Sequence, residues 1–183
     1  MVKEKIILGI DPGTNITGYG LIKSVNNKPE LITLGIIKLQ KNTTHFARLE
    51  KIFKDVLKII ELYNPDELAI EAPFFGKNVQ SMLKLGRAQG VSIAAALSRS
   101  MPVFEYAPRK IKLAVTGNGA ASKEQVSMFL QQLFKTKNFP KELDATDGLA
   151  AAVCHFYQKN LSSGDTHYSS WKSYISNNPN KIR

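Results

Sequence analysis

The fold is decided near the start of the chain, by Ile6-Ile7-Leu8-Gly9-Ile10-Asp11-Pro12-Gly13-Thr14. Its apolar run is typical of a buried strand, and the Pro-Gly pair predicts a tight turn directly after Asp11. A second apolar run, residues 68–70, likewise ends in an acid, Glu71, and is followed by Pro73. Both acids are therefore expected where a strand ends and the chain leaves a sheet.

Two more acids stand three residues apart at the start of a predicted helix. Asp144 and Asp147 share one helical face, because residues i and i+3 are neighbours on a helix. Carboxylates packed together repel one another and destabilise a fold unless cations hold them. A divalent metal is the economical explanation, and Mg²⁺ prefers hard oxygen ligands. The sequence thus predicts a metal site made of four acids, Asp11, Glu71, Asp144 and Asp147.

Each acid also has an ordinary explanation when it is taken alone. Asp11 fits an Asp-Pro-Gly turn, Glu71 fits a solvated strand end, and the helical pair fits an acidic first turn favoured by the helix dipole. Residues 11–14 also match the phosphate-binding loop of the actin, Hsp70 and sugar-kinase ATPases. Those proteins have two lobes and roughly twice the domain size expected here, so the length argues against that reading.

The predicted elements describe one α/β domain, residues 1–161, followed by a polar tail, residues 162–183. Strands are expected at residues 5–10, 18–23, 31–39, 68–71 and 103–106, and helices at 46–63, 79–99, near 108, from 122 and at 142–160. The helix at 46–63 is expected to bury an apolar set that begins with Phe46, and the helix from Ser122 is expected to bury Val126, Phe129, Leu130 and Leu133. This order predicts a mixed five-stranded sheet, its first three strands antiparallel, with helices on both faces.

The bulk composition indicates a protein that acts on a polyanion. Lys and Arg number 25 against 15 Asp and Glu, a formal charge of +10, which favours nucleic acid first and an anionic membrane surface second. No apolar stretch approaches the roughly 20 residues of a membrane span, and the N-terminus lacks a signal-peptide pattern. The single cysteine, Cys154, excludes an internal disulfide framework and fits a reducing compartment, so we expect the cytoplasm.

An aromatic and basic segment follows Glu71. Phe74 and Phe75 stand beside Lys77, an arrangement suited to stacking on an unpaired base, although one of the two rings is expected to point inward. Further cations that could hold phosphates are Lys84, Arg87, Arg109, Lys110, Lys112 and Lys123. Gly13 and Gly18 would let a phosphate or metal approach the backbone. His155 is expected to be packed rather than catalytic, and Cys154 to be a small buried residue.

Taken together, ordered blocks of residues resemble the RuvC Holliday-junction resolvases of bacteria. The blocks are Gly9 to Gly13, Gly18-Tyr19-Gly20, Ala69-Ile70-Glu71 with Phe74 and Lys77-Asn78, Leu83 to Gly86, Pro102 to Tyr106, Gly117-Asn118-Gly119 with Lys123, and Asp144 to Asp147. The segment Gly86-Arg87-Ala88-Gln89-Gly90 departs from the family's Gly-Gln-Ala-Arg-Gly, so no arginine role is carried over there.

The resemblance implies an RNase H-like fold, a homodimer, and Mg²⁺-dependent cutting of four-way DNA junctions by paired nicks. By position, Asp11, Glu71, Asp144 and Asp147 resemble the catalytic acids, Phe74 the aromatic that enters the junction, and Lys112 and Lys123 the DNA-contacting lysines. Two Mg²⁺ ions are expected, with Mn²⁺ as a substitute. RuvA and RuvB are possible partners, and the helix at 79–99 is the expected dimer interface. Two alternatives stay open: a catalytically silent junction-binding module, and an RNase H-like nuclease acting on another nucleic acid.

Overall fold

The computed structural model describes residues 4–40, 43–73, 78–136, 139–140 and 142–164. Five strands form one sheet in the order β3-β2-β1-β4-β5: β1 (Lys5–Asp11), β2 (Ile16–Val25), β3 (Lys28–Lys38), β4 (Glu67–Glu71) and β5 (Val103–Tyr106). The first three strands pair antiparallel, whereas β4 runs parallel to β1 and β5 runs parallel to β4. The predicted mixed sheet is confirmed.

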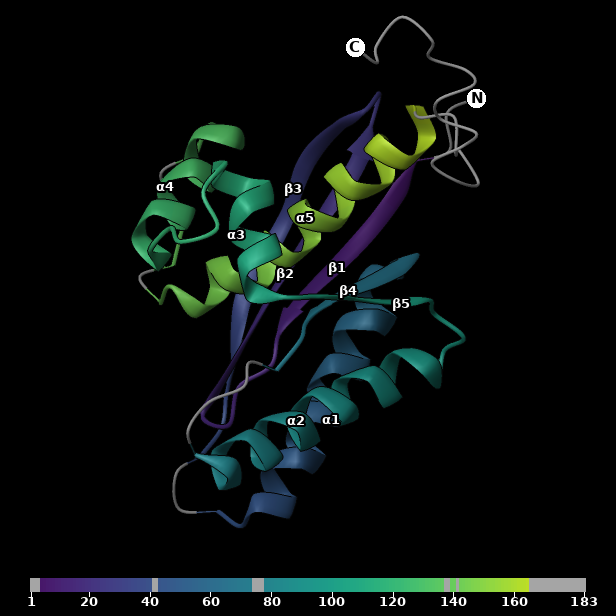
Figure 1. Cartoon of the computed structure of the whole chain (residues 1–183). Helices are drawn as coiled ribbons and strands as arrows, with labels where there is room; N and C mark the ends of the chain where they lie inside the picture. The colour runs from purple at the N-terminus through teal and green to yellow at the C-terminus, as the bar shows by residue number, and fades with distance from the viewer. Residues whose placement is uncertain (1–3, 41–42, 74–77, 137–138, 141, 165–183) are drawn as a thin grey trace, which may run out of the picture.

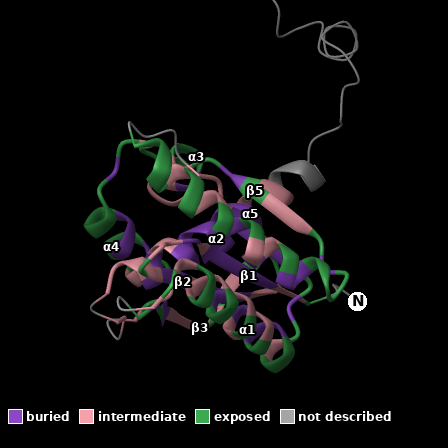
Figure 2. Cartoon of the chain, turned by 90° about the horizontal axis from the view of Figure 1, so that it is seen from below, coloured by how far each residue is buried: buried purple, intermediate pink, exposed green. Residues whose placement is uncertain are grey.

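Helices cover both faces of this sheet, as Figure 1 shows. One layer is formed by α1 (His45–Tyr63) and α2 (Val79–Leu97), and the other by α3 (Pro108–Thr116), α4 (Lys123–Leu133) and α5 (Asp144–Gly164). Successive residues of a strand point to opposite faces. Accordingly, Leu8 and Ile10 join the core under α1 and α2, while Ile7 joins the core under α5. Figure 2 shows the buried β1 and α5 at the centre, with exposed residues on the outer sides of the flanking helices.

Helix α5 lies unusually close to the sheet because glycines remove the side chains in its path. A Cβ on Gly18 would stand 1.7 Å from the carbonyl oxygen of Asp144, and one on Gly9 would stand 2.1 Å from that of Gly148. The expectation that Gly18 makes room for a phosphate or metal is therefore wrong. It makes room for the first turn of α5, and Gly13 does the same for the backbone at Ile16. These contacts set where Asp144 and Asp147 stand.

Short local motifs determine where several helices and strands begin or end. Asn26 and Asn27 both have positive φ, 51° and 59°, so a two-residue turn joins β2 to β3. Both strands are longer than predicted because their ladder continues right up to this turn. At the start of α4 the Ser122 hydroxyl accepts from the backbone N–H of Gln125, and the Gln125 side chain accepts from the Ser122 N–H, which confirms the predicted capping box.

Some predicted core residues are on the surface instead. Phe46 is 75% exposed in the first turn of α1, and Phe129 is 45% exposed on α4. Helix α4 buries the narrow stripe formed by Val126 and Leu130. Phe129 is about 100° around the helix axis from Leu130 and so faces outward, and Leu133 is also exposed at the helix end.

The predicted tail falls mainly outside the described residues. Helix α5 continues through Gly164, and residues 165–183 are not described. Within the described part of the chain, none of the helices combines the length and the apolar character that crossing a bilayer requires.

Candidate metal and nucleic-acid site

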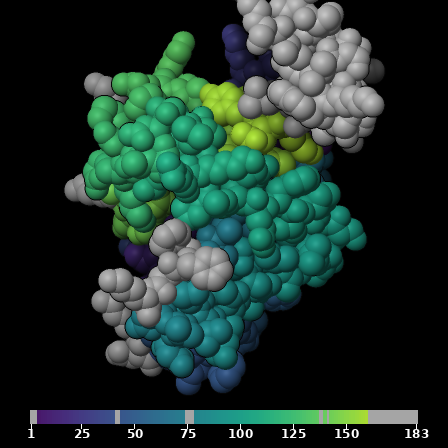
Figure 3. All heavy atoms as spheres, in the orientation of Figure 1, coloured from purple at the N-terminus to yellow at the C-terminus, as the bar shows by residue number. Residues whose placement is uncertain are grey.

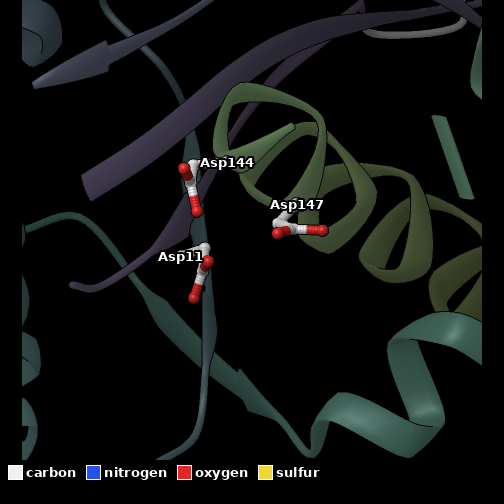
Figure 4. A group of neighbouring side chains, drawn as sticks. All are labelled: Asp11, Asp144 and Asp147. Carbon is white, nitrogen blue, oxygen red and sulfur yellow. The ribbon is translucent and has the colours of Figure 1, made fainter. Parts of the chain in front are cut away.

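The strand ends bring the first two acids together. Ile10 of β1 pairs with Ile70 of β4 in parallel register, so the next residues, Asp11 and Glu71, end adjacent strands. Neighbouring strands are roughly 4.8 Å apart. The other two acids, Asp144 and Asp147, belong to the first turn of α5, which packs on one face of the sheet. Asp11, Asp144 and Asp147 each offer a carboxylate oxygen, and these oxygens lie within 4.8 Å of one another (Figure 4).

Glu71 completes the predicted set from the side of β4. It lines a cavity of about 750 Å³ together with Asp11 and Asp147. The α3–α4 lobe supplies the facing wall of this cavity, through residues that include Pro108 and Gly119. In Figure 3 the green α3–α4 lobe stands above the blue-teal layer of α1 and α2. The structure thus gathers all four predicted acids, although they come from three separate parts of the chain.

Burial makes three of the acids, Asp11, Glu71 and Asp147, harder to ionise. Burial raises the pKa of Asp11 well above its usual value, and the nearby charges of Glu71 and Asp147 raise it further. Burial and the charge of Asp147 raise the pKa of Glu71 to about 7, despite the opposing effect of Lys123. The pKa of Asp147 is raised as well, first by burial. Without more positive charge, this cluster destabilises the folded chain at neutral pH.

One lysine partly relieves the repulsion. The Lys123 ammonium donates a hydrogen bond of 3.2 Å to Asp144 Oδ1 and forms an ion pair of 2.5 Å with Asp147 Oδ2. Burial opposes the charge on Lys123, but Asp147 and Asp144 outweigh it and raise the lysine's pKa. Asp147 Oδ2 is a buried atom, and its described partner is the Lys123 ammonium.

These features fit a divalent cation. The donors are carboxylate oxygens, which are the ligands that Mg²⁺ and Mn²⁺ favour. A single ammonium group cannot neutralise four acids, so a doubly charged ion would relieve the repulsion more completely.

The residues predicted to contact DNA divide into three groups. Arg109 and Lys112 of α3 and Lys123 of α4 line the cavity of the acids, as expected. Lys84 does not: it lines a different cavity, next to the N-terminal ends of α1 and α2. The predictions for Phe74 and Lys77 concern residues 74–77, which lie outside the described residues.

One polar contact, between α2 and the end of β4, was not predicted from the sequence. The buried side chain of Gln89 on α2 donates to the backbone carbonyl of Glu71, at 3.4 Å, and to Glu105 Oε1, at 3.2 Å. It also lines a small pocket shared with Asp11 and Glu71. Its only signal in the sequence was a polar residue between small ones, in Ala88-Gln89-Gly90. Gln89 therefore supports the end of β4 from the α2 side.

Comparisons with known proteins show the family to which the chain belongs. Residues 7–155 match the family model for the crossover junction endodeoxyribonuclease RuvC. RuvC of Bacteroides fragilis is 60% identical over 100% of this chain and 98% of its own length, and RuvC of Christiangramia forsetii is 57% identical over 98% and 94%. The solved structure of T. thermophilus RuvC in complex with a Holliday junction substrate is 28% identical, with a TM-score of 0.79 over 87% of this chain and 97% of that one.

The fold is therefore RNase H-like. The chain belongs to the RuvC family of crossover junction endodeoxyribonucleases, as its resemblance in sequence predicted. It is accordingly a hydrolytic enzyme that cleaves phosphodiester bonds in DNA.

Proposed function

We propose that this protein is a Mg²⁺-dependent endonuclease that resolves four-way DNA junctions by paired, symmetric nicks. The observation that carries the proposal is the meeting of Asp11, Asp144 and Asp147, with oxygens within 4.8 Å, beside Glu71 at the end of the next strand. Relatives named for cutting crossover junctions, and a neighbour solved with a Holliday junction, support the choice of substrate.

The four acids are proposed as metal ligands rather than as proton carriers. Two divalent ions held by these carboxylates would supply an activated water and would stabilise the leaving oxygen. Lys112 and Arg109, on the wall of the same cavity, are proposed to hold the flanking phosphates. Lys123 neutralises Asp144 and Asp147 before the metal binds, and its ammonium is then available to a DNA phosphate. Mn²⁺, which also accepts oxygen ligands, is proposed to substitute for Mg²⁺.

Two symmetric cuts require two sites, which a twofold homodimer would provide. Helix α2 offers a suitable surface. An exposed stripe repeats at helical spacing and consists of Val79, Leu83, Gly90, Ala94 and Leu97, with the half-buried Gly86 in the same row. None of the described residues lies within 4 Å of a Cβ placed on Gly86 or Gly90, so the described surface leaves this backbone open to a second copy. Val79 and Leu97 are each at least 60% exposed. Contact of these apolar side chains with water is unfavourable, and burial in a dimer would remove it.

Three further parts of the proposal rest on the family and the composition. Phe74 and Lys77 are proposed to meet the junction centre. The cytoplasm is the proposed location, because DNA is the proposed substrate and the chain carries a single cysteine. Docking of RuvA and RuvB stays a prediction.

The direct test offers the purified protein a mobile four-way junction and a linear duplex, each with and without Mg²⁺. We expect paired nicks in the junction alone, and only with the metal. Asp144→Asn should lose cutting yet bind the junction as well as before or better, since repulsion of phosphate falls. Full Mg²⁺-dependent cutting by that variant would overturn the assignment of the acids.

The same assay separates the alternatives. Tight, salt-sensitive junction binding with no cutting by the unmodified protein would indicate a silent binding module. Preferential cutting of an RNA–DNA hybrid would indicate another RNase H-like nuclease. Phe74→Ala should slow junction cutting, whereas an unchanged rate would remove that ring from the proposal.

A further inference from the structure

A second polar cavity, of about 420 Å³, lies beside the turn that follows Asp11. Its walls come from the β1–β2 turn, the N-terminal part of α1 and the first turns of α2, and include Thr14, Asn15, His45, Arg48, Ser81 and Lys84. We call this cavity the turn pocket. Among its described lining residues are two cations and an imidazole but no acid. Such a lining suits an anion.

The polar groups of the turn pocket are held in place by the fold. Arg48 Nη1 donates to the backbone carbonyl of Thr14 and to Asn15 Oδ1, both at 3.3 Å, which fixes the guanidinium against the turn. A guanidinium carries five N–H donors in a rigid fork, a shape that matches phosphate oxygens. His45 Nε2 is buried in the pocket wall and has no hydrogen-bond partner among the described residues. An anion entering the pocket would supply the missing partner.

The charges around the turn pocket also favour a bound anion. The pKa of His45 is lowered, first by partial burial and then by the positive charges of Arg87, Lys84 and Arg48. Three cations therefore act on the same imidazole. Like charges gathered around one cavity are stabilised by a bound anion.

The turn pocket is within reach of the strand that would cross the acids. Thr14 is three residues from Asp11, so their Cα atoms are at most about 11 Å apart. In duplex DNA each strand presents a phosphate roughly every 3.4 Å of helix axis. A strand with one phosphate at the four acids would therefore place another, a few nucleotides away, at the turn pocket.

We propose that the turn pocket binds a backbone phosphate of the same DNA strand whose scissile phosphate meets the four acids. Arg48, Lys84 and the His45 imidazole hold that phosphate, and the turn at Thr14 and Asn15 links it to the metal site. The pocket sets the register of the strand on the enzyme without reading its sequence. This inference rests on the proposed function, because it assumes that DNA crosses the acids.

The test measures junction affinity without metal over a range of salt concentrations. Lys84→Gln, which removes an exposed charge, and Arg48→Gln should each weaken binding severalfold and lower the salt slope by about 0.9, the value for one lost phosphate contact. Lys28→Gln is the matched control. It removes the same charge at the opposite end of β2, about 30 Å away, and should leave the slope unchanged.

An equal effect of Lys28→Gln and Lys84→Gln would overturn the proposal, because it would reveal only a loss of general charge. Unchanged slopes for both pocket variants would overturn it as well. These outcomes differ from a failure of the proposed function. A protein that binds junctions with the expected slopes but never cuts would lose its nuclease role and keep its turn pocket.

A second readout follows His45 itself. Its pKa, measured by NMR and assigned with His45→Gln, should rise when a short DNA oligonucleotide binds, since the added phosphate stabilises the imidazolium. The buried His155 is the internal control and should not shift. Inorganic phosphate provides the comparison: an equal rise at equal concentration would indicate a site for free phosphate and contradict the role in strand register.

Discussion

Strand β4 begins and ends with a glutamate, and the fold treats the two in opposite ways. Glu67 and Glu71 are four residues apart, about 13 Å along the strand. Glu67 is 5% exposed, and Glu71 is also largely removed from solvent. Burial alone would raise the pKa of both carboxyl groups. The groups around each carboxyl therefore determine whether its pKa is raised or lowered.

Glu67 is surrounded by hydrogen-bond donors. Lys5 Nζ donates to it at 2.7 Å, Lys159 also donates, and His155 Nε2 lies 2.9 Å from its second oxygen. Because a carboxylate can only accept, Nε2 of a neutral His155 carries the proton, and Nδ1 accepts from the Tyr106 hydroxyl at 2.6 Å. Burial acts to raise the pKa of Glu67, but these hydrogen bonds outweigh it and lower the pKa to about 2.

Glu71 meets other acids instead. Burial and the charge of Asp147 raise its pKa to about 7. The comparison teaches that a buried glutamate stabilises this fold where cations surround it and destabilises the fold where acids do. A residue that destabilises the folded chain is a candidate for a functional role, and metal binding is such a role.

The largest expected effect separates the two glutamates by activity. Glu71→Gln should slow junction cutting by about a thousandfold or more, because metal ions contribute several kcal/mol to such reactions and each 1.36 kcal/mol is tenfold in rate. Cutting rates per folded molecule should stay near normal in Glu67→Gln. A single-turnover assay on a four-way junction measures both, and equal losses in the two variants would break the contrast.

The next effect separates them by stability. Glu67→Gln should destabilise the protein by about 3 kcal/mol, since it leaves Lys5 and Lys159 without their counter-charge and weakens the hydrogen bond that the neutral His155 donates. Urea unfolding measures this loss. Glu61→Gln is the control, because it removes a surface carboxylate whose only described ion pair is with Arg99, and it should change little. A negligible loss in Glu67→Gln would mean that the network at the start of β4 does not support the fold.

The smallest effect is a pair of opposite pH dependences in the metal-free protein. The folded pKa of Glu67 lies below its usual 4.5, so its stabilisation is present above pH 4.5 and is lost as the pH falls towards 2. The folded pKa of Glu71 lies above 4.5, so stability is lost as the pH rises from 4.5 through about 7. Unfolding curves of the protein and of each Gln variant test this. Each variant should lack only the slope of its own residue, and a slope of the opposite sign would contradict the account.

Much of the fold and of the candidate site could be predicted from the sequence, but not all of either. The two apolar runs predicted Asp11 and Glu71 at strand ends, and the spacing of Asp144 and Asp147 predicted both on one helix turn. The structure brings these four acids close together. The limits of β5, Val103–Tyr106, were predicted as the structure has them. Local patterns sufficed because each of these features depends on a few neighbouring residues.

Features that depend on how helices pack were not predictable. Lys123 meets Asp144 and Asp147 only because α4 packs beside α5, across 21 residues of chain. Lys84 was grouped with the acids by sequence order, yet α2 carries it to the turn pocket. The role of Gly18 became clear only from the closeness of α5. His155 was correctly expected to be buried, but its partner Glu67 is 88 residues away.

The most direct test of the central claim is the stability of Glu71→Gln at pH 8, measured by urea unfolding without and with Mg²⁺. Without metal, the variant should be more stable than the unmodified protein by about 2 kcal/mol, because it removes one of four repelling charges. With saturating Mg²⁺ the order should reverse, since the unmodified site gains binding energy that the variant loses. A variant that is less stable in both conditions, with no response of either protein to Mg²⁺, would contradict the claim that these acids form a metal site.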